Sequence, residues 1–419
     1  SIAGKWHQAY PANDENLWPG NRGFDESFCL IQGGAGHFGD QQKLFSFYDR
    51  TRYTENDVVV EQLPADFYSS DYYTTKAIEH IDNGVALGKP FFAYLAFTAP
   101  HWPLQVPDES IDLYKGRYAE GYEILAEERL SKGKQLGIVS EKVEMTTLSP
   151  NVKPWDQLTG SEQEESARIM EVYAAMIERM DANVGRLIEH LKATGQYDNT
   201  VIIFLSDNGA EGNSVNGIVD TGEWVKANFD NSLANIGRRN SYVFTGPSWA
   251  QVSSLPFKWY KTFSTEGGVR SPAIISYPKW AHLAGKINTS YLSVMDIAPT
   301  ILELAGATHP GSMYQGRAIY PMDGTSMVNW LSGKEASVHA DSTVHCWELF
   351  GRIGVRQANW KAEFYDTPYG SGAWELYDLS NDPSETQDVA RNHPEKIQEL
   401  QAAWNEYVVK YDVTLPNEH

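Results

Sequence analysis

Cysteine and positive charge are both scarce in this chain of 419 residues. Its two cysteines, Cys29 and Cys346, are too few for a disulfide framework, and neither belongs to a zinc-type Cys-x-x-Cys pair. Lysine and arginine number 34 against 55 aspartates and glutamates, which gives a formal net charge of -21. A field of that sign repels nucleic-acid backbones and anionic membranes, so we expect no nucleic-acid partner and no membrane partner.

Long apolar runs are missing as well. No stretch approaches the length of a membrane span and none resembles a signal peptide, and the sequence leaves the cellular compartment open. A hydrophobic content of 42% and an aromatic content of 12% instead exclude a disordered protein. The length suffices for one large domain and a smaller one.

Apolar periodicity predicts an α/β core. Residues 91–97 and 201–205 are continuously apolar, which is typical of strands buried on both faces. Residues 161–193 carry apolar side chains at three- and four-residue spacing and predict a long helix, with Ser161 and Glu164 as its capping box. The alternation of strand and helix favours a mainly parallel sheet flanked by helices.

Further elements complete this outline. Residues 272–278 predict a short strand and residues 299–306 a short helix. We expect a catalytic domain over 1–336 and a small C-terminal α+β subdomain over 337–419, because aromatic strands and a helix near 394–411 dominate there.

Two polar, weakly periodic segments, residues 109–160 and 213–256, predict long loops that cover a site. Their aromatic residues could stack on a substrate, and packing within the loops is the commoner alternative: Tyr118, Tyr122, Trp224, Tyr242 and Trp249.

Polar residues follow two of the predicted strands. His101 follows the first, and Asp207 with Asn208 follows the second, so we expect them at the same edge of the sheet, where ligands of parallel sheets bind. A carboxylate and an amide oxygen suit calcium or magnesium better than zinc, although an Asx turn after a strand explains the same pair. Lys5, His7 and Lys261, each taken alone, are ordinary surface residues.

Taken together, four segments resemble the sulfatase family of the alkaline-phosphatase superfamily. They are, in this order, "GKWH" at 4–7, "TAPHWP" at 98–103, "FLSDNGAEG" at 204–212 and "KTFSTEGGVRSP" at 261–272. The resemblance covers nearly the whole chain, and the insertions between the segments are similar to those of the large bacterial arylsulfatases. It implies an alkaline-phosphatase-like α/β fold and hydrolysis of an organic sulfate ester, a small molecule.

The resemblance also implies a nucleophile that this chain lacks. Sulfatases carry a Cys/Ser-x-Pro-x-Arg motif upstream of "GKWH", whose first residue is oxidised to formylglycine, and a pair of metal-binding aspartates before it. Neither Cys29 nor Cys346 begins such a motif. We therefore expect formylglycine, and some of the metal ligands, on a missing N-terminal segment that completes the site.

The remaining roles follow from the resemblance. In the family a hydroxyl of the hydrated formylglycine attacks sulfur and the alcohol leaves; the second hydroxyl is then deprotonated and sulfate departs. Lys5 would hold the formylglycine and a sulfate oxygen, His7 would be the base for sulfate release, and His101 and Lys261 would contact the sulfate, with His101 the acid for the leaving group. Asp207 and Asn208 would bind one Ca²⁺.

Two alternatives remain open. A phosphonate monoester hydrolase or phosphodiesterase of the same superfamily would act on similar geometry, although Asp207-Asn208 in place of Asp-His disfavours its two-zinc phosphatases. An inactive fragment that only binds sulfated ligands is the second alternative. The alcohol half of the ester stays undetermined, with aryl sulfates favoured over sulfated glycans.

Overall fold

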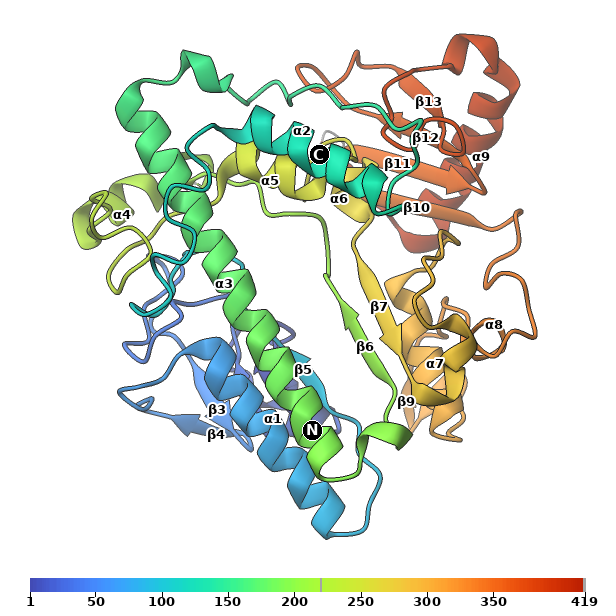
Figure 1. Ribbon diagram of the computed structural model, residues 1–419. Coiled ribbons are helices and arrows are strands. Elements are labelled where there is room, and N and C mark those ends of the chain that lie inside the picture. The colour runs from blue at the N-terminus through green and yellow to red at the C-terminus, as the bar shows by residue number, and fades with distance from the viewer. Residues whose placement is uncertain (219–220, 417–419) are drawn as a thin grey trace. The chain divides into compact units, whose positions relative to one another are not determined.

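The computed structural model describes residues 1–218 and 221–416, which form two compact units (Figure 1). One unit comprises Ser1–Glu128, Asn151–Tyr197 and Glu211–Ser253. The other comprises Arg129–Pro150, Asp198–Ala210 and Ser254–His419. Each unit therefore combines segments that are distant in the sequence.

A five-stranded mixed sheet forms the base of the first unit, with strand order β4-β3-β2-β1-β5. β1 pairs in parallel with both β2 and β5, whereas β3 and β4 extend the sheet in antiparallel fashion. The strands are β1 Ile2–Lys5, β2 Ser27–Leu30, β3 Tyr53–Glu55, β4 Val58–Val60 and β5 Tyr94–Ala96.

The two central strands are buried on both faces. Successive side chains of a strand point to opposite faces. Ile2 and Cys29 belong to one apolar cluster, and Ala3 and Phe28 belong to another. Gly4 has φ +122°, and a Cβ there would lie 1.9 Å from the carbonyl oxygen of Ala96, so only glycine lets β1 approach β5 this closely.

The two strands predicted to be buried on both faces are shorter and more exposed than expected. β5 lies at the edge of its sheet, and Tyr94 is 52% exposed. In the second unit, β6 (Ile202–Leu205) pairs only with β7 (Ala273–Ser276), and its four side chains are half-buried. A strand with one neighbour lacks the covering that a central strand receives, which is why apolar content alone overstated the burial.

Two long helices lie side by side (Figure 1): α1 Ser69–Ala86, which packs against the sheet, and α3 Gly160–Ala193, which packs against α1. Arg179 of α3 donates to both carboxylate oxygens of Asp71 on α1, at 2.9 and 2.5 Å, and Asn183 donates to the same carboxylate at 2.7 Å. The predicted helix is thus confirmed, and a polar cluster joins it to α1.

The predicted cap of α3 is wrong by two residues. Thr159, not Ser161, is the N-cap: its hydroxyl accepts from the Glu162 amide, and the Glu162 carboxylate accepts from the Thr159 amide. Both pairs have capping-box spacing, and the extended backbone of Thr159 decides between them.

Helices also occupy the two segments predicted as long loops. They are α2 Tyr122–Gln135, α4 Thr221–Asn228 and α5 Gly246–Ser254. Of the aromatic residues considered for substrate stacking, Tyr118, Tyr122, Tyr242 and Trp249 are buried and Trp224 is half-buried. These rings contact one another, so packing, the commoner alternative, is what the structure shows.

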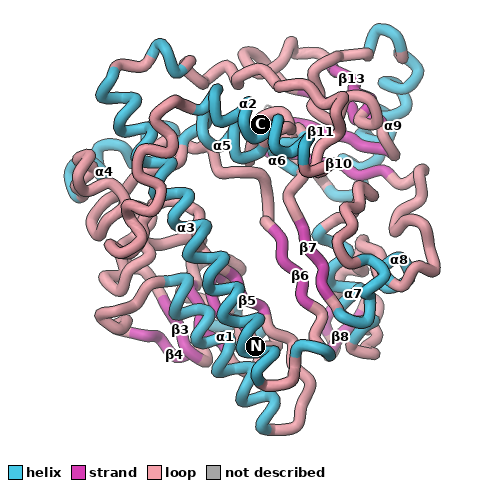
Figure 2. The backbone as a smooth tube through the Cα atoms, in the orientation of Figure 1, coloured by secondary structure: helices cyan, strands magenta, loops and turns pink. Residues whose placement is uncertain are grey.

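In the second unit, Figure 2 shows β6 and β7 running side by side as an isolated antiparallel pair. The predicted short helix is confirmed as α7. The other elements before the C-terminal sheet are short: α6 Glu266–Val269, α7 Ile297–Leu304, β8 Met313–Tyr314, β9 Arg317–Ala318 and α8 Val328–Leu331.

A four-stranded antiparallel sheet and one helix close the chain, as the aromatic alternation predicts. The strands, in sheet order, are β10 Val344–Leu349, β11 Arg352–Gln357, β12 Trp360–Phe364 and β13 Trp374–Asp378, and the helix is α9 Pro394–Tyr411. Leu400 and Trp404 of α9 pack on the sheet. The division at residue 336 stays a prediction.

A buried ion cluster anchors this sheet to α6. The ammonium of Lys361 lies 3.0 Å from Glu266, 2.7 Å from Glu385 and 3.2 Å from Glu363, and all four side chains are at most 1% exposed. Removing these charges from water costs free energy, which the attraction between the opposite charges offsets.

Among the helices described, none is both long and apolar enough to span a membrane.

Candidate active site

Lys5 and His7 stand where β1 ends. The Trp6 amide donates to the carbonyl of Leu30 at 2.8 Å and the His7 amide to that of Ile31 at 3.1 Å, which keeps the chain alongside β2. His7 then adopts a left-handed φ of 54°, and its imidazole lies over Gly33, where a Cβ would come within 2.6 Å of Nε2. The backbone therefore turns His7 out of the strand direction into an exposed position.

His101 follows the neighbouring strand, β5. Its Nδ1 lies 2.8 Å from the carbonyl oxygen of Trp102, and because a carbonyl only accepts, Nδ1 carries a proton. Nε2 lies 3.7 Å from the carboxylate of Glu211, whose side chain is 10% exposed. Glu211 therefore places a poorly hydrated carboxylate beside the second nitrogen of the ring.

His37, which the sequence analysis missed, contacts the backbone of His101. Its Nε2 lies 3.2 Å from the carbonyl oxygen of His101, so Nε2–H donates, and Nδ1 accepts from the hydroxyl of Ser69 at 2.7 Å. Burial lowers the pKa of His37 to about 4, so the ring is neutral at physiological pH. No motif marks His37, and Glu211 lies in the quoted segment 204–212 without having been singled out; the contacts with His101 identify both residues.

Parallel pairing brings the first three candidates to one edge. β1 and β5 are adjacent and parallel, with Gly4 beside Ala96, so the segments carrying Lys5, His7 and His101 leave the sheet at the same carboxyl edge. Ligands of parallel sheets bind at such edges.

The other three candidates lie in the second unit. The Lys261 amide donates to the carbonyl of Ala210 at 3.0 Å, which ties Lys261 to the loop of Asp207 and Asn208 after β6. Gly209 in this loop is a close-approach position, since a Cβ there would lie 1.9 Å from the carbonyl oxygen of Gly267. The structure thus groups Asp207, Asn208 and Lys261 with one another. That these residues share one site with Lys5, His7 and His101 stays a prediction.

The donor chemistry of Asp207 and Asn208 fits a hard cation. Asn208 donates its Nδ2 to the carbonyl of Gly209 at 2.9 Å, a hydrogen bond that does not involve the amide oxygen. Together the two residues present oxygen donors, as calcium prefers. The described residues contain no group of three or more His, Cys, Asp or Glu side chains able to hold a metal, so this pair supplies only part of the six to eight oxygens calcium takes.

Neither cysteine has the properties of a nucleophile. Burial, with a smaller contribution from Asp57, raises the pKa of the Cys29 thiol, and burial raises the pKa of Cys346 to about 12. Reactive cysteines need the thiolate, which both environments disfavour.

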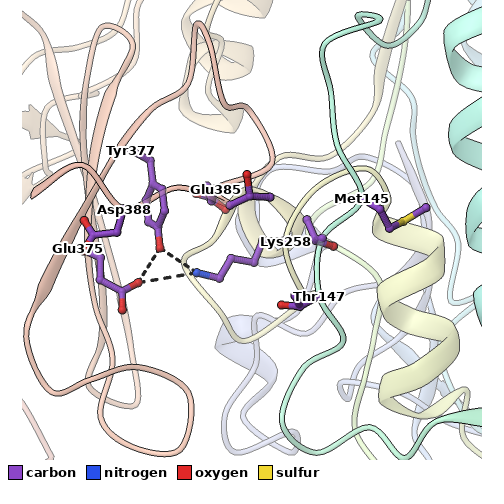
Figure 3. Close-up of a pocket in the computed structure, with 9 residues that line it drawn as sticks. Met145, Thr147, Lys258, Glu375, Tyr377, Glu385 and Asp388 are labelled. Atoms are coloured by element: carbon purple, nitrogen blue, oxygen red, sulfur yellow. Dashed lines mark hydrogen bonds and ion pairs between the residues drawn. The ribbon is translucent and has the colours of Figure 1, made fainter.

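A cavity of about 280 Å³ in the second unit does not suit sulfate (Figure 3). Among its lining residues Lys258 is the one cation, whereas Glu375, Glu385 and Asp388 are acidic. Lys258 donates to the hydroxyl of Tyr377 at 3.1 Å, and that hydroxyl donates to Glu375 at 2.6 Å, as the dashed lines show. An anion would meet net negative charge here.

Comparison with known proteins identifies the family. The family description "Sulfatase" matches residues 1–307, and "N-sulphoglucosamine sulphohydrolase, C-terminal" matches residues 256–412. An uncharacterized sulfatase of Schizosaccharomyces pombe is 43% identical over the whole chain, which spans 76% of that protein. An arylsulfatase of Klebsiella aerogenes is 40% identical over 78% of this chain and 69% of its own length.

Solved structures confirm the fold class. The crystal structure of Ps i-CgsB in complex with k-i-k-neocarrahexaose has a TM-score of 0.65 and 25% identity, covering 99% of this chain and 72% of that one. The expected α/β fold with a C-terminal sheet subdomain is therefore correct, although the sheet of the first unit is mixed. With the family match extending over most of its length, this chain belongs to the sulfatase family.

Proposed function

We propose that this sulfatase hydrolyses an aryl sulfate ester to a phenol and inorganic sulfate. The observation that carries the proposal is the convergence of Lys5, His7 and His101 at the carboxyl edge of two adjacent parallel strands. In a chain with a net charge of -21, such a local group of cationic side chains suits a small anion. The relative in Klebsiella aerogenes, an arylsulfatase, supports the aryl class.

Lys5 and Lys261 bind sulfate oxygens in this proposal. Ammonium groups make charge-assisted hydrogen bonds with anionic oxygens, about twice as strong as neutral ones. Lys5 is half-buried at the end of β1, so part of its hydration is already removed before the substrate binds. Lys261 is likewise half-buried, beside the loop of Asp207 and Asn208.

His101 protonates the leaving phenolate oxygen. With Nδ1–H donating to the carbonyl of Trp102, the ring can exchange a proton only through Nε2. Glu211, 3.7 Å from that nitrogen, stabilises the charged imidazolium before the proton is given up. His37 fixes the backbone of His101 and therefore acts as a positioning residue.

His7 acts as the base that removes a proton when sulfate is released. Its exposed ring lies on the other segment of the same edge, and its position over Gly33 requires the absence of a side chain there. The base and the acid thus come from two different strand ends, which lets each face a different oxygen of the ester.

Two groups outside the described residues complete the proposal. Formylglycine, on a segment that is not among the 419 residues, would supply a diol nucleophile, and Ca²⁺ would supply positive charge that stabilises anionic oxygens. Asp207 and Asn208 would hold the ion through oxygen. The motif whose first residue becomes formylglycine is absent from the printed sequence, and neither thiol of the chain can replace it.

Turnover by the whole protein, as a cell makes it, tests the proposal. We expect 4-nitrophenyl sulfate to be hydrolysed with a higher kcat/KM than phenyl phosphonate, and mass spectrometry to find a formylglycine peptide. Preferred hydrolysis of the phosphonate would assign the enzyme to phosphoryl chemistry. An unmodified precursor residue, with sulfate binding but no turnover, would make the protein a binding member of the family.

A further inference from the structure

An exposed aromatic surface lies beside the candidate site in the first unit. It is formed by Phe45, Phe47 and Tyr48, which follow β2, and we call it the aromatic ledge. Phe45 and Phe47 stack with ring centroids 5.0 Å apart and planes 10° from parallel, and Tyr48 packs edge-on against both rings. Phe47 is 74% exposed. Since one face of its ring is covered by Phe45, the opposite face is open.

Ring contacts connect the ledge to His101. Phe45 meets Trp102 edge-on at 5.8 Å, and Trp102 contacts the imidazole of His101 at 4.8 Å. Trp102 is itself fixed, because it is 4% exposed and stacks on Phe244 at 4.3 Å. The ledge and His101 therefore pack against the same buried tryptophan, the ledge through Phe45 and His101 through its imidazole.

A second exposed ring approaches from the segment of His7. Tyr10, three residues after His7, is 95% exposed. Burial raises the pKa of Tyr48, and Tyr10 adds a smaller increase. Tyr10 therefore lies near Tyr48, although Tyr10 makes no ring contact with the ledge among the described contacts.

Hydrogen bonds from two side chains to the backbone of residues 44–48 hold the ledge in place. The hydroxyl of Tyr242 donates to the carbonyl of Leu44, and the Lys43 ammonium donates to the carbonyls of Ser46 and Tyr48 at 3.4 and 2.9 Å. A preorganised surface loses little conformational entropy when a ligand binds. Exposing an apolar ring face to water costs free energy, and covering that face with another flat apolar ring is favourable.

The charges around the ledge argue against a polyanionic glycan. Arg50 pairs with Glu61 at 2.7 Å and Arg52 with Asp49 at 3.4 Å, while Lys43 is occupied by backbone carbonyls. A chain bearing several sulfates would need cations that face it. A single aromatic ring needs only the open face of Phe47.

We propose that Phe47, supported by Phe45 and Trp102 and flanked by Tyr10, is a specificity-determining residue that binds the aromatic ring of an aryl sulfate. This inference rests on the proposed function, because it places the sulfate of the same ester against His101. Aromatic stacking contributes about 0.5–1.5 kcal/mol beyond area burial, which converts to about 2- to 13-fold in affinity.

Phe47→Ala in the whole protein tests the inference. We expect KM for 4-nitrophenyl sulfate to rise about 5- to 10-fold, kcat to change less than 2-fold, and the inhibition constant of inorganic sulfate to stay within 2-fold. Phe47→Trp should restore KM, because it restores a flat ring. Leu87→Ala is the matched control, because Leu87 is also highly exposed, at 70%, and precedes β5, at the sheet edge opposite to His101. The KM of this variant should equal that of the wild type.

Binding of 4-nitrophenol, measured by calorimetry, separates this inference from the proposed function. If the wild-type protein binds 4-nitrophenol and Phe47→Ala weakens it 5-fold or more, the ledge binds rings even in a protein without sulfatase turnover. Unchanged binding of both 4-nitrophenol and 4-nitrophenyl sulfate in Phe47→Ala would overturn the inference. A loss confined to glucosamine 6-sulfate would also overturn it, since the ledge would then serve a sugar.

Discussion

At the scale of single residues, the candidate site depends on how each histidine is hydrogen-bonded. His101 donates from Nδ1 to a carbonyl and places Nε2 beside Glu211, whereas His37 uses both of its nitrogens for hydrogen bonds to Ser69 and His101. The same side chain is thus the proposed proton donor in one position and a neutral support in the other. The difference arises from burial, since His37 is 1% exposed.

Replacement of His101 by alanine should affect aryl sulfates unequally. A phenol of high pKa needs a proton when it departs, whereas 4-nitrophenol leaves readily as an anion, so the loss should be on the order of 10²–10⁴-fold for the poor leaving group and much smaller for the good one. Steady-state kinetics on a series of phenyl sulfates measures this. Equal losses along the series would reduce His101 to a sulfate-binding residue. His190→Ala is the control and should leave the series unchanged, because His190 pairs with Asp82 between α3 and α1.

His37 should make the protein acid-sensitive. Its pKa is about 4 in the folded state against 6.5 when exposed, so the unfolded state takes up the proton first. The stability it contributes is complete above pH 6.5, decreases as the pH falls below that value, and is lost as the pH passes 4. The loss should reach about 2–3 kcal/mol at pH 4.5.

Urea unfolding of His37→Gln at pH 7.5 and pH 4.5 measures this contribution. Glutamine can make similar hydrogen bonds but does not titrate. Between pH 7.5 and pH 4.5, the free energy of unfolding of the variant should therefore decrease by about 2 kcal/mol less than that of the wild type. Parallel decreases in the two proteins would show that other groups cause the acid sensitivity.

At the scale of elements, side-chain chemistry at the start of α3 determines where the helix begins. Thr159 and Glu162 satisfy each other's amides, whereas Ser161 contacts only the hydroxyl of Thr159. The helix then runs for 34 residues and carries the Arg179–Asp71 contact to α1. The cap therefore sets the start of the helix that packs on α1, which covers the sheet.

Thr159→Ala should lower the free energy of unfolding by about 1 kcal/mol, because the Glu162 amide loses the hydroxyl that accepts its hydrogen bond. Ser161→Ala is a matched control two residues away and should change stability by less than about 0.5 kcal/mol. Thermal or urea denaturation of both variants gives the comparison. A larger effect at Ser161 would return the cap to its sequence-predicted position.

At the scale of the whole molecule, the charge distribution matters more than the net charge. A protein with a net charge of -21 can bind sulfate only where cationic side chains gather, and it attracts calcium wherever oxygens converge. The proposed ion would bind the loop after β6 only when the protein is folded, so metal binding should raise the free energy of unfolding.

Calcium should raise the melting temperature of the whole protein. An ion at 100 times its Kd stabilises the folded state by about 2.7 kcal/mol, which corresponds to a shift of several degrees, and a chelator should reverse it and abolish turnover. Asp207→Ala should remove the calcium-dependent part of the melting temperature. A calcium shift that persists in Asp207→Ala would place the ion elsewhere.

The sequence by itself determined the helices with strong periodicity, the C-terminal sheet and helix, and the segments that carry Lys5, His7, His101, Asp207, Asn208 and Lys261. These features are local: an apolar repeat or a short motif is complete within a few residues. The bounds of α3 and α9 accordingly agree closely with the prediction.

Only the tertiary structure decided which strands are central, which aromatic rings are exposed and which groups support His101. β1 and β2 are too short to show a pattern, yet they are buried on both faces, whereas the more apolar β5 lies at an edge. Trp249 is buried although it lies in a polar, weakly periodic stretch of sequence, whereas Phe47 is open to water although its neighbours are mostly apolar. His37 meets His101 across 64 positions of the chain. Burial and partnership depend on contacts between distant segments, and no local pattern of residues encodes those.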